Sequence, residues 1–277
     1  MFESRGRTVF KDRQALSFDF VPPKLVHRDA QLKRLTSLFS PVVESNVSQM
    51  AFLSGHVGTG KTVTAKRFCM DLKEYGTKSN KAVDFVTVNC RQRNSEAATL
   101  LHIVNHFQPN FPDRGFSISE MMEILRKDLD KRKTHLIIVL DEADVLLRKS
   151  GSDIIYRLSR FAEEGLDGRQ QVSLILISQK DIFSLLDPAS ASTFKRSNTV
   201  EFGKYSVKEL EDIARQRAEI ALHKGTIDDD SLRLIADASS DYGDARFAIE
   251  ILDKSGMLAD EDGSEVVTPE HIRAAKA

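Results

Sequence analysis

Five short apolar segments, each bounded by polar or turn-forming residues, predict five buried β-strands. They are Met50–Ser54, Asp84–Asn89, His135–Leu140, Ser173–Ser178 and Thr199–Phe202. In the third segment every position from Leu136 to Leu140 is apolar, whereas a strand with one face in water would alternate. We therefore expect this strand to be covered on both faces, as in a parallel sheet.

Helical patterns separate the strands. Thr62–Glu74 follows the first strand, and Ser119–Lys131 precedes the third. Strands that alternate with helices predict an α/β fold with a five-stranded parallel sheet in an αβα sandwich. Residues 91–131 exceed what one crossover needs, and Gln108–Gly115 is rich in turn formers. This stretch is predicted to contain an inserted second helix.

The pattern becomes purely helical after Phe202. Ser206–His223 is amphipathic, and Ser206 with Glu209 has the spacing of a capping box. Further helices are predicted over Asp228–Ser239, Asp244–Ala259 and from Pro269 onward. We therefore predict two domains, an α/β domain over residues 1–203 and a small all-α domain over residues 204–277.

Composition narrows the functional class. The 277 residues carry 40 lysines and arginines against 41 aspartates and glutamates, which argues against a protein that coats nucleic acid by net charge alone. No apolar run approaches the ~20 residues of a membrane span, and Met1–Arg13 lacks the apolar core of a secretory signal. We expect a cytoplasmic protein in which Cys69 and Cys90 are small buried residues.

The segment Gly55–Thr62 has the G-x-x-x-x-G-K-T spacing of a phosphate-binding loop. An apolar strand precedes it and a helix follows it, which makes a chance glycine-rich turn a poor explanation. Glycines let backbone N–H groups surround phosphates, and the helix directs its positive dipole end toward them. Lys61 is predicted to bind the β and γ phosphates and Thr62 to bind Mg²⁺.

Asp141 and Glu142 end the most apolar strand. A carboxylate at Asp141 suits Mg²⁺, and Glu142 suits a base that orients the attacking water. Taken alone, the pair is equally well explained as the start of a helix. Together with the phosphate-binding loop it predicts an ATPase that binds ATP or ADP with Mg²⁺.

Other candidates are less specific. Ser178 or Gln179, at the end of the fourth strand, could sense the γ phosphate, or they could be ordinary strand-end polar residues. Arg246 opens a predicted helix and suits a phosphate contact, although it could also be a solvated helix residue. His102 and His106 share a helix face, but no third ligand accompanies them, so we predict no metal site there.

These motifs together resemble AAA+ ATPases, and more narrowly the archaeal initiators related to the eukaryotic origin recognition complex and its Cdc-six partner. The matching segments are Pro22–Arg28, Val88–Arg91, Val139–Asp144 and Gly243–Arg246. The resemblance implies nucleotide contacts at Val26, Arg28, Val57, Gly58, Thr59, Gly60, Lys61, Thr62, Val63, Tyr205, Arg217 and Arg246. It assigns catalytic roles to Glu142, Lys61, Gln179 and Arg246.

The resemblance also implies a function. Such proteins bind replication origins under the control of ATP, hydrolyse it slowly, and help to load the replicative helicase. Duplex DNA, the helicase and paralogous initiator subunits are the implied partners. The insertion within residues 91–131 is similar to the family's DNA-contacting helical insertion, and Arg114 is its candidate phosphate contact. Arg114 could equally be an exposed loop residue.

Three departures from the family pattern change these expectations. The first sensor is usually asparagine, whereas Gln179 stands here. The arginine expected before the last strand is not obvious, because the only basic residues there are Lys195 and Arg196. The family continues into a winged-helix domain that would begin near Ala277, either outside this sequence or lacking. We expect weak DNA binding without it.

Three rival interpretations stay open. Another AAA+ machine, such as a clamp loader or a remodelling ring, predicts fast turnover and stable rings. A signalling or defence switch predicts no DNA binding. A chain that only binds nucleotide predicts no turnover, although Lys61, Asp141 and Glu142 argue against that reading.

Overall fold

A computed structural model describes residues 8–161, 170–194 and 198–276. The chain divides into two compact units, and we describe each by itself. The sheet unit comprises Ala30–Gly55 and Thr64–Phe202. The helical unit comprises Gly203–Ala277, His56–Val63 and the described part of Met1–Asp29. The predicted domain boundary between residues 203 and 204 stays a prediction.

The sheet unit is built on five parallel strands in the order β2-β3-β4-β1-β5. The strands are β1 (Met50–Gly55), β2 (Ala82–Asn89), β3 (Thr134–Asp141), β4 (Val172–Ser178) and β5 (Thr199–Phe202). The predicted α/β fold is therefore confirmed. Because all strands run the same way, their carboxyl ends share one edge of the sheet.

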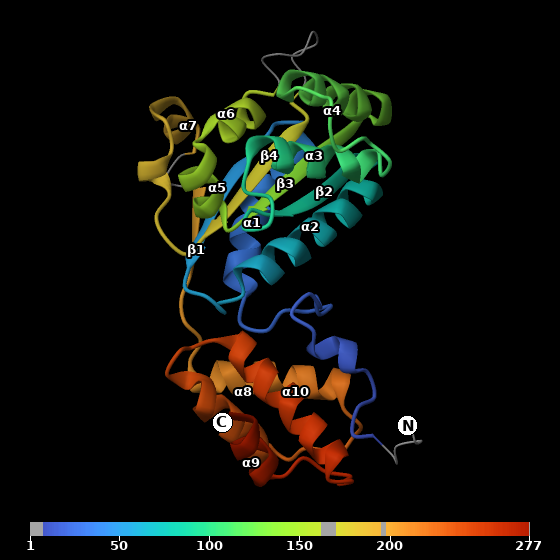
Figure 1. Cartoon of the computed structure of the whole chain (residues 1–277), viewed down its shortest axis with the longest axis vertical. Coiled ribbons are helices and arrows are strands. Elements are labelled where there is room, and N and C mark those ends of the chain that lie inside the picture. Colours follow the sequence, from blue (N-terminus) through green and yellow to red (C-terminus); the bar gives the residue numbers. More distant parts are fainter. Residues whose placement is uncertain (1–7, 162–169, 195–197, 277) are drawn as a thin grey trace. The chain divides into compact units, whose positions relative to one another are not determined.

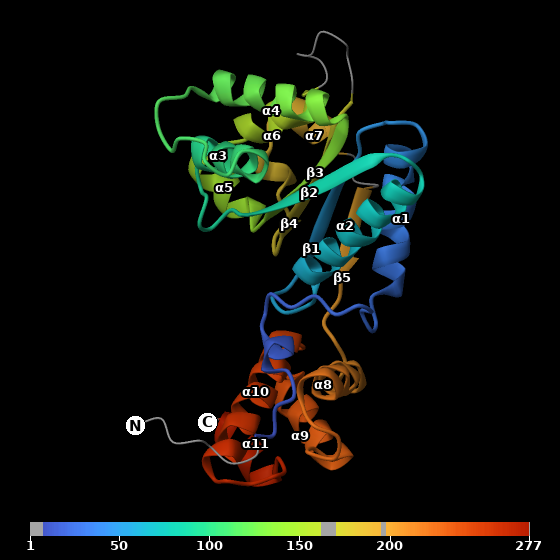
Figure 2. The ribbon, with the colours of Figure 1, turned by 90° about the vertical axis from the view of Figure 1, so that its right-hand side faces the viewer.

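Strand β3 explains why the helices form two layers. Successive side chains of a strand point to opposite faces. Leu136, Ile138 and Leu140 enter one apolar core, which α3–α6 help to form, and Ile137 and Val139 enter a second core with α1 and α2. Figure 2 shows these two helix layers on either side of the sheet. All five residues are fully buried, as the unbroken apolar run predicted.

The helices associated with the sheet follow the predicted alternation (Figure 1). They are α1 (Asp29–Glu44), α2 (Lys61–Lys78), α3 (Glu96–Phe107), α4 (Ile118–Arg132), α5 (Ala143–Ser150), α6 (Asp153–Ser159) and α7 (Pro188–Thr193), with a short 3₁₀ turn at Phe183–Leu185. Both α3 and α4 lie between β2 and β3, so the inserted second helix is present. Ser95 caps α3, and Ser117 with Glu120 forms a capping box on α4.

Four helices make up most of the helical unit: α8 (Val207–Ala221), α9 (Asp229–Ser240), α10 (Ala245–Glu261) and α11 (Pro269–Lys276). Ser206 and Glu209 form the predicted capping box on α8. The chain from Val9 to Leu16, including a 3₁₀ turn at Arg13–Leu16, packs on the same apolar core. None of the described helices is both long and apolar enough to cross a bilayer.

Candidate functional site

The phosphate-binding loop adopts at two positions a left-handed backbone that favours glycine. Gly58 and Gly60 have φ angles of 69° and 86°, in the left-handed region. A Cβ atom on Gly58 would lie 1.6 Å from Oδ1 of Asp244, and one on Gly60 would lie 2.5 Å from the Tyr205 hydroxyl. The two glycines therefore let the loop pack closely against the start of the helical segment after Gly203.

The interior of the loop is organised around the carbonyl of His56. This oxygen accepts a hydrogen bond from Thr59 Oγ1 at 2.8 Å and from Lys61 Nζ at 2.5 Å. The backbone N–H groups of Val57, Gly58 and Thr59 have no acceptor among the described residues. A buried ammonium group beside several free N–H donors is a set that suits phosphate oxygens, so the loop fits a nucleotide.

Arg28 holds the phosphate-binding loop in place through the Thr59 carbonyl. Its Nε and Nη2 atoms donate to the Thr59 carbonyl at 3.0 and 2.8 Å, and its guanidinium lies 3.8 Å from the centre of the Tyr205 ring. Burial lowers the pKa of Arg28 and raises the pKa of Tyr205 to about 12. Both side chains therefore support the loop directly; their contact with the nucleotide stays a prediction.

Arg217 and Val26 serve the packing of the N-terminal segment. Arg217 donates to the carbonyls of Ala15 at 2.8 Å and Phe20 at 3.3 Å, and it lies over the Phe20 ring. Burial lowers the pKa of Arg217 to about 10. Val26 packs on the core of the helical unit. The structure gives these residues a structural task, and their predicted nucleotide contact is not tested by it.

The start of α10 meets the phosphate-binding loop within the helical unit. Ala245 N–H donates to the Gly58 carbonyl at 3.1 Å, and Asp244 caps the helix by accepting from Arg246 N–H at 2.7 Å. The Arg246 side chain is exposed and has no partner within the described part of the chain. Arg246 follows directly after the residue that contacts the loop, and its side chain is exposed to solvent.

The acidic pair lies at the carboxyl edge of the sheet. Asp141 ends β3, and its Oδ1 accepts from Glu142 N–H at 3.0 Å. Glu142 has a φ of 57°, an unusual value for a residue other than glycine that often marks a functional position. A carboxylate such as that of Asp141 suits Mg²⁺, which keeps several waters and binds few protein groups.

Glu142 has a partner that sequence reasoning missed. Arg91 Nε and Nη2 each donate to a different carboxylate oxygen of Glu142 at 3.0 Å. The pair forms because β2 and β3 are neighbours in register, with Asn89 opposite Asp141. The hydrogen bond to Glu142 raises the pKa of Arg91. The adjacency of two strand ends was the available signal, and it required knowledge of the strand order.

At the end of β4, the structure distinguishes the two sensor candidates. Ser178 is buried, and its Oγ donates to Asp144 Oδ1 at 3.0 Å while accepting from Lys180 N–H at 3.1 Å. Gln179 follows it and is exposed to solvent. The catalytic role of Gln179 stays a prediction.

The remaining candidates lie in the loop, in the first turn of α2 and in the turn between α3 and α4. Val57 is exposed in the loop, and Thr62 and Val63 are half-buried in the first turn of α2. Arg114 is exposed in the turn between α3 and α4. Lys195 and Arg196 lie outside the described residues.

The two histidines and two cysteines are accounted for by packing. His102 contacts the Thr87 carbonyl, and His106 pairs with Asp84 at 2.8 Å. Both thiols are free and buried. Burial raises the pKa of Cys69, and it raises the pKa of Cys90 to about 12, so both are protonated at neutral pH.

Two protein families match this chain. Residues 46–186 match the family described as an AAA domain, and residues 211–277 match the Cdc6 AAA+ ATPase-type lid domain. Sequence relatives agree: the ORC1-type DNA replication protein 1 of Sulfurisphaera tokodaii is 36% identical over 275 residues, which are 99% of this chain and 67% of the relative. The chain spans about two thirds of the length of such relatives.

Solved structures have the same fold. The Aeropyrum pernix ORC1 protein in complex with DNA has a TM-score of 0.87 and 32% identity, over 98% of this chain and 70% of that one. The Aeropyrum pernix ORC2 protein, described as ADPNP-ADP complexes, has a TM-score of 0.88 over 97% of this chain and 72% of that one. At 24% identity, the second likeness shows the fold alone.

The Arg28–Thr59 contact leads to a prediction about the loop itself. Arg28→Ala leaves the buried Thr59 carbonyl without its donors, which costs about 1–3 kcal/mol locally. We expect faster amide hydrogen exchange across residues 56–62 in the nucleotide-free protein, measured by mass spectrometry. Arg13→Ala, which removes an exposed arginine paired with Asp253, is the matched control and should leave this segment unchanged. Equal exchange in both variants would remove Arg28 from the role of loop support.

Proposed function

This chain belongs to the AAA+ family of ORC1-type DNA replication proteins, and from that membership we propose that it is an ATP-dependent replication initiator that hydrolyses ATP slowly. The observation that carries the proposal is the phosphate-binding loop, whose Gly58 carbonyl is hydrogen-bonded to the first N–H of α10. Loss of the γ phosphate would change the loop, and the loop is hydrogen-bonded to α10 of the helical lid. A nucleotide-dependent switch requires such a connection.

Each residue of the site has a defined task in this proposal. The loop N–H groups and Lys61 hold the β and γ phosphates, while Thr62 and Asp141 hold Mg²⁺. The metal supplies charge neutralisation at the phosphates when it is bound. Glu142 orients water for attack and accepts its proton. Arg246 grips phosphate oxygens from the start of α10.

The Arg91–Glu142 ion pair supports slow turnover. Both carboxylate oxygens of Glu142 accept hydrogen bonds from one guanidinium. A carboxylate engaged in this way is a poor acceptor for a proton from water. The Arg91 side chain is 69% exposed, so the pair contributes little stability and separates readily. Hydrolysis then requires the Arg91–Glu142 ion pair to break first.

DNA and protein partners follow from the relatives. The Aeropyrum pernix ORC1 structure contains DNA, and we extend duplex binding to this chain through the exposed turn that carries Arg114. With a net charge of -1, the chain offers little general attraction for DNA, so the binding is weak. The replicative helicase and paralogous initiator subunits complete the proposed set of partners.

Two substitutions test the nucleotide chemistry. Lys61→Ala removes a charged phosphate contact, and we expect ATP affinity to fall roughly 10–100-fold in equilibrium dialysis. Glu142→Gln keeps the shape of the side chain but removes the base, so we expect unchanged affinity and turnover lowered by about 10²–10⁴-fold. Normal affinity in the first variant, or normal turnover in the second, would refute the respective assignment.

Breaking the Arg91–Glu142 ion pair should raise turnover, unlike the loss of Glu142 itself. Arg91→Ala should raise basal ATP turnover severalfold because it frees Glu142, measured by phosphate release with saturating ATP. The double variant Arg91→Ala/Glu142→Gln should be inactive, since the effect acts through Glu142. Arg93→Ala, an exposed arginine two residues further on, is the control and should behave as wild type. A fall in turnover with Arg91→Ala would show that Arg91 assists catalysis rather than restraining it.

Duplex DNA binding tests the initiator role against a signalling switch. We expect weak, salt-sensitive binding in fluorescence anisotropy, with an affinity that differs between ATP and ADP. Arg114→Ala should lower the slope of log K against log salt by about 0.9, the value for one lost phosphate contact. Arg273→Ala, an exposed arginine of α11, should leave the slope unchanged. No detectable binding in either nucleotide state would count against an initiator.

A further inference from the structure

The sheet unit contains a cavity at the edge opposite the carboxyl ends of the strands. It measures about 640 Å³ and is formed by the ends of α1, α2 and α4 and by the chain entering β1, β2, β3 and β4. Strand β3 has eight residues, so its two ends are roughly 23 Å apart. The cavity is therefore separate from Asp141 and Glu142.

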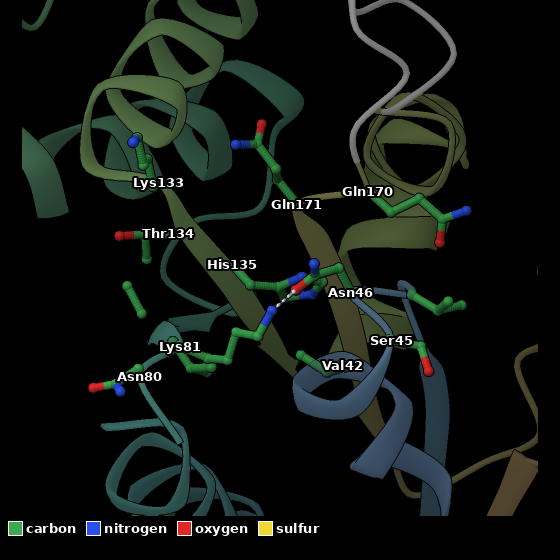
Figure 3. Close-up of a pocket in the computed structure, with 13 residues that line it drawn as sticks. Val42, Ser45, Asn46, Asn80, Lys81, Lys133, Thr134, His135, Gln170 and Gln171 are labelled. Atoms are coloured by element: carbon green, nitrogen blue, oxygen red, sulfur yellow. Dashed lines mark hydrogen bonds between the residues drawn. The ribbon is translucent and has the colours of Figure 1, made fainter. Parts of the chain in front are cut away.

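Among the described residues, the cavity is lined by two cations and no anion. Lys81 and Lys133 belong to its wall, and none of the lining residues is an aspartate or a glutamate. Neither lysine has an ion-pair partner within the described ranges, whereas Lys73 and Lys78 each bind a carboxylate at 2.7 Å. Figure 3 shows Lys81 reaching to Asn46, whose Oδ1 is 3.4 Å away, a long and easily exchanged hydrogen bond.

The lysines are not needed to cap the surrounding helices. Helix C-termini attract cations, which would give these residues a purely structural role. Here, backbone groups already bind terminal carbonyls: Lys81 N–H donates to Gly76 at 2.8 Å, and Lys133 N–H donates to Asp130 at 3.1 Å. Both ammonium groups therefore stay available to a ligand.

The backbone around the cavity is held in an uncommon conformation. Asn46, Asn80 and Lys133 have φ angles of 52°, 53° and 51°. Asparagine tolerates this left-handed region, but lysine rarely adopts it. Asn80 and Lys133 follow α2 and α4, where a left-handed residue commonly ends a helix, so the helix ends fix this part of the cavity wall.

Buried polar side chains form the back wall. His135 and Gln171 are only 8% and 9% exposed. His135 Nε2 is 2.7 Å from Ser173 Oγ, and burial lowers the pKa of the ring to about 4, so it is neutral at physiological pH. The Gln171 side chain makes no hydrogen bond to another described residue, and its amide is not among the buried groups that lack a partner. Figure 3 shows His135 beside Lys81 and Asn46, with the Gln171 side chain pointing away from them.

We propose that this cavity binds a small phosphorylated metabolite. Its volume falls in the range of small-molecule sites, and its described lining combines ammonium groups with amide donors and contains no carboxylate. Lys81 and Lys133 bind the phosphate oxygens, and Asn46 and Gln171 hydrogen-bond the polar body of the ligand. The site is independent of the proposed nucleotide chemistry.

The test uses the full chain saturated with Mg²⁺ and ADP, so that the phosphate-binding loop is filled. Inorganic phosphate and glycerol 3-phosphate are titrated separately, and the side-chain resonances of Asn46, Gln171 and His135 are followed by NMR. We expect saturable shifts at these three residues with both probes. Lys81→Gln and Lys133→Gln should each weaken the apparent affinity by about tenfold, the effect of one lost charged hydrogen bond.

Lys131→Gln is the matched control, because Lys131 lies two residues from Lys133 on α4 but does not line the cavity. It should change the affinity by less than twofold. Absence of shifts with either probe would overturn the proposal, as would an equal loss in all three variants. A response to short duplex DNA without one to the phosphate probes would also overturn it, and would assign the cavity to nucleic acid.

Discussion

The arrangement of the phosphate-binding loop depends on one buried guanidinium. Arg28 binds the Thr59 carbonyl through two N–H groups and stacks on Tyr205, whose hydroxyl approaches Gly60. A carbonyl held in this way fixes the peptide plane and turns the neighbouring N–H groups toward the inside of the loop. The closeness of Gly58 to Asp244 then follows, because the loop and the start of α10 share one packed structure. Binding energy at the phosphates is thus available to the helical lid without a separate relay.

The parallel sheet brings the other candidate site residues together at the carboxyl ends of its strands. Three strand ends bring Arg91, Glu142 and Ser178 to a common edge, although they come from separate parts of the chain. Arg91 pairs with Glu142 from the neighbouring strand end, and Ser178 pairs with Asp144, which follows β3.

The sequence predicted the strands and most helices because their signals are local. The apolar run of β3 and the capping boxes at Ser117 and Ser206 depend on neighbours within a few positions. The phosphate-binding loop and Asp141–Glu142 were found for the same reason. The Arg91–Glu142 pair was not, because it joins residues 51 positions apart through a strand order that local pattern does not specify. The cavity at the opposite edge of the sheet could not be predicted from the sequence, because its lining residues come from several helix ends that share no motif.

The helical unit is completed by both ends of the chain. Lys11 N–H binds the Ala221 carbonyl at 2.7 Å, and Val9 N–H binds Asp260 Oδ1, a residue 251 positions away. Contacts of such high sequence separation form late, because the intervening chain must first be closed into a loop. During synthesis the sheet unit is complete before α10 has been made. The N-terminal segment around Val9 can bind Asp260 only afterwards. The N-terminal segment can therefore dock only after α10 has been synthesised, later than the sheet unit can fold.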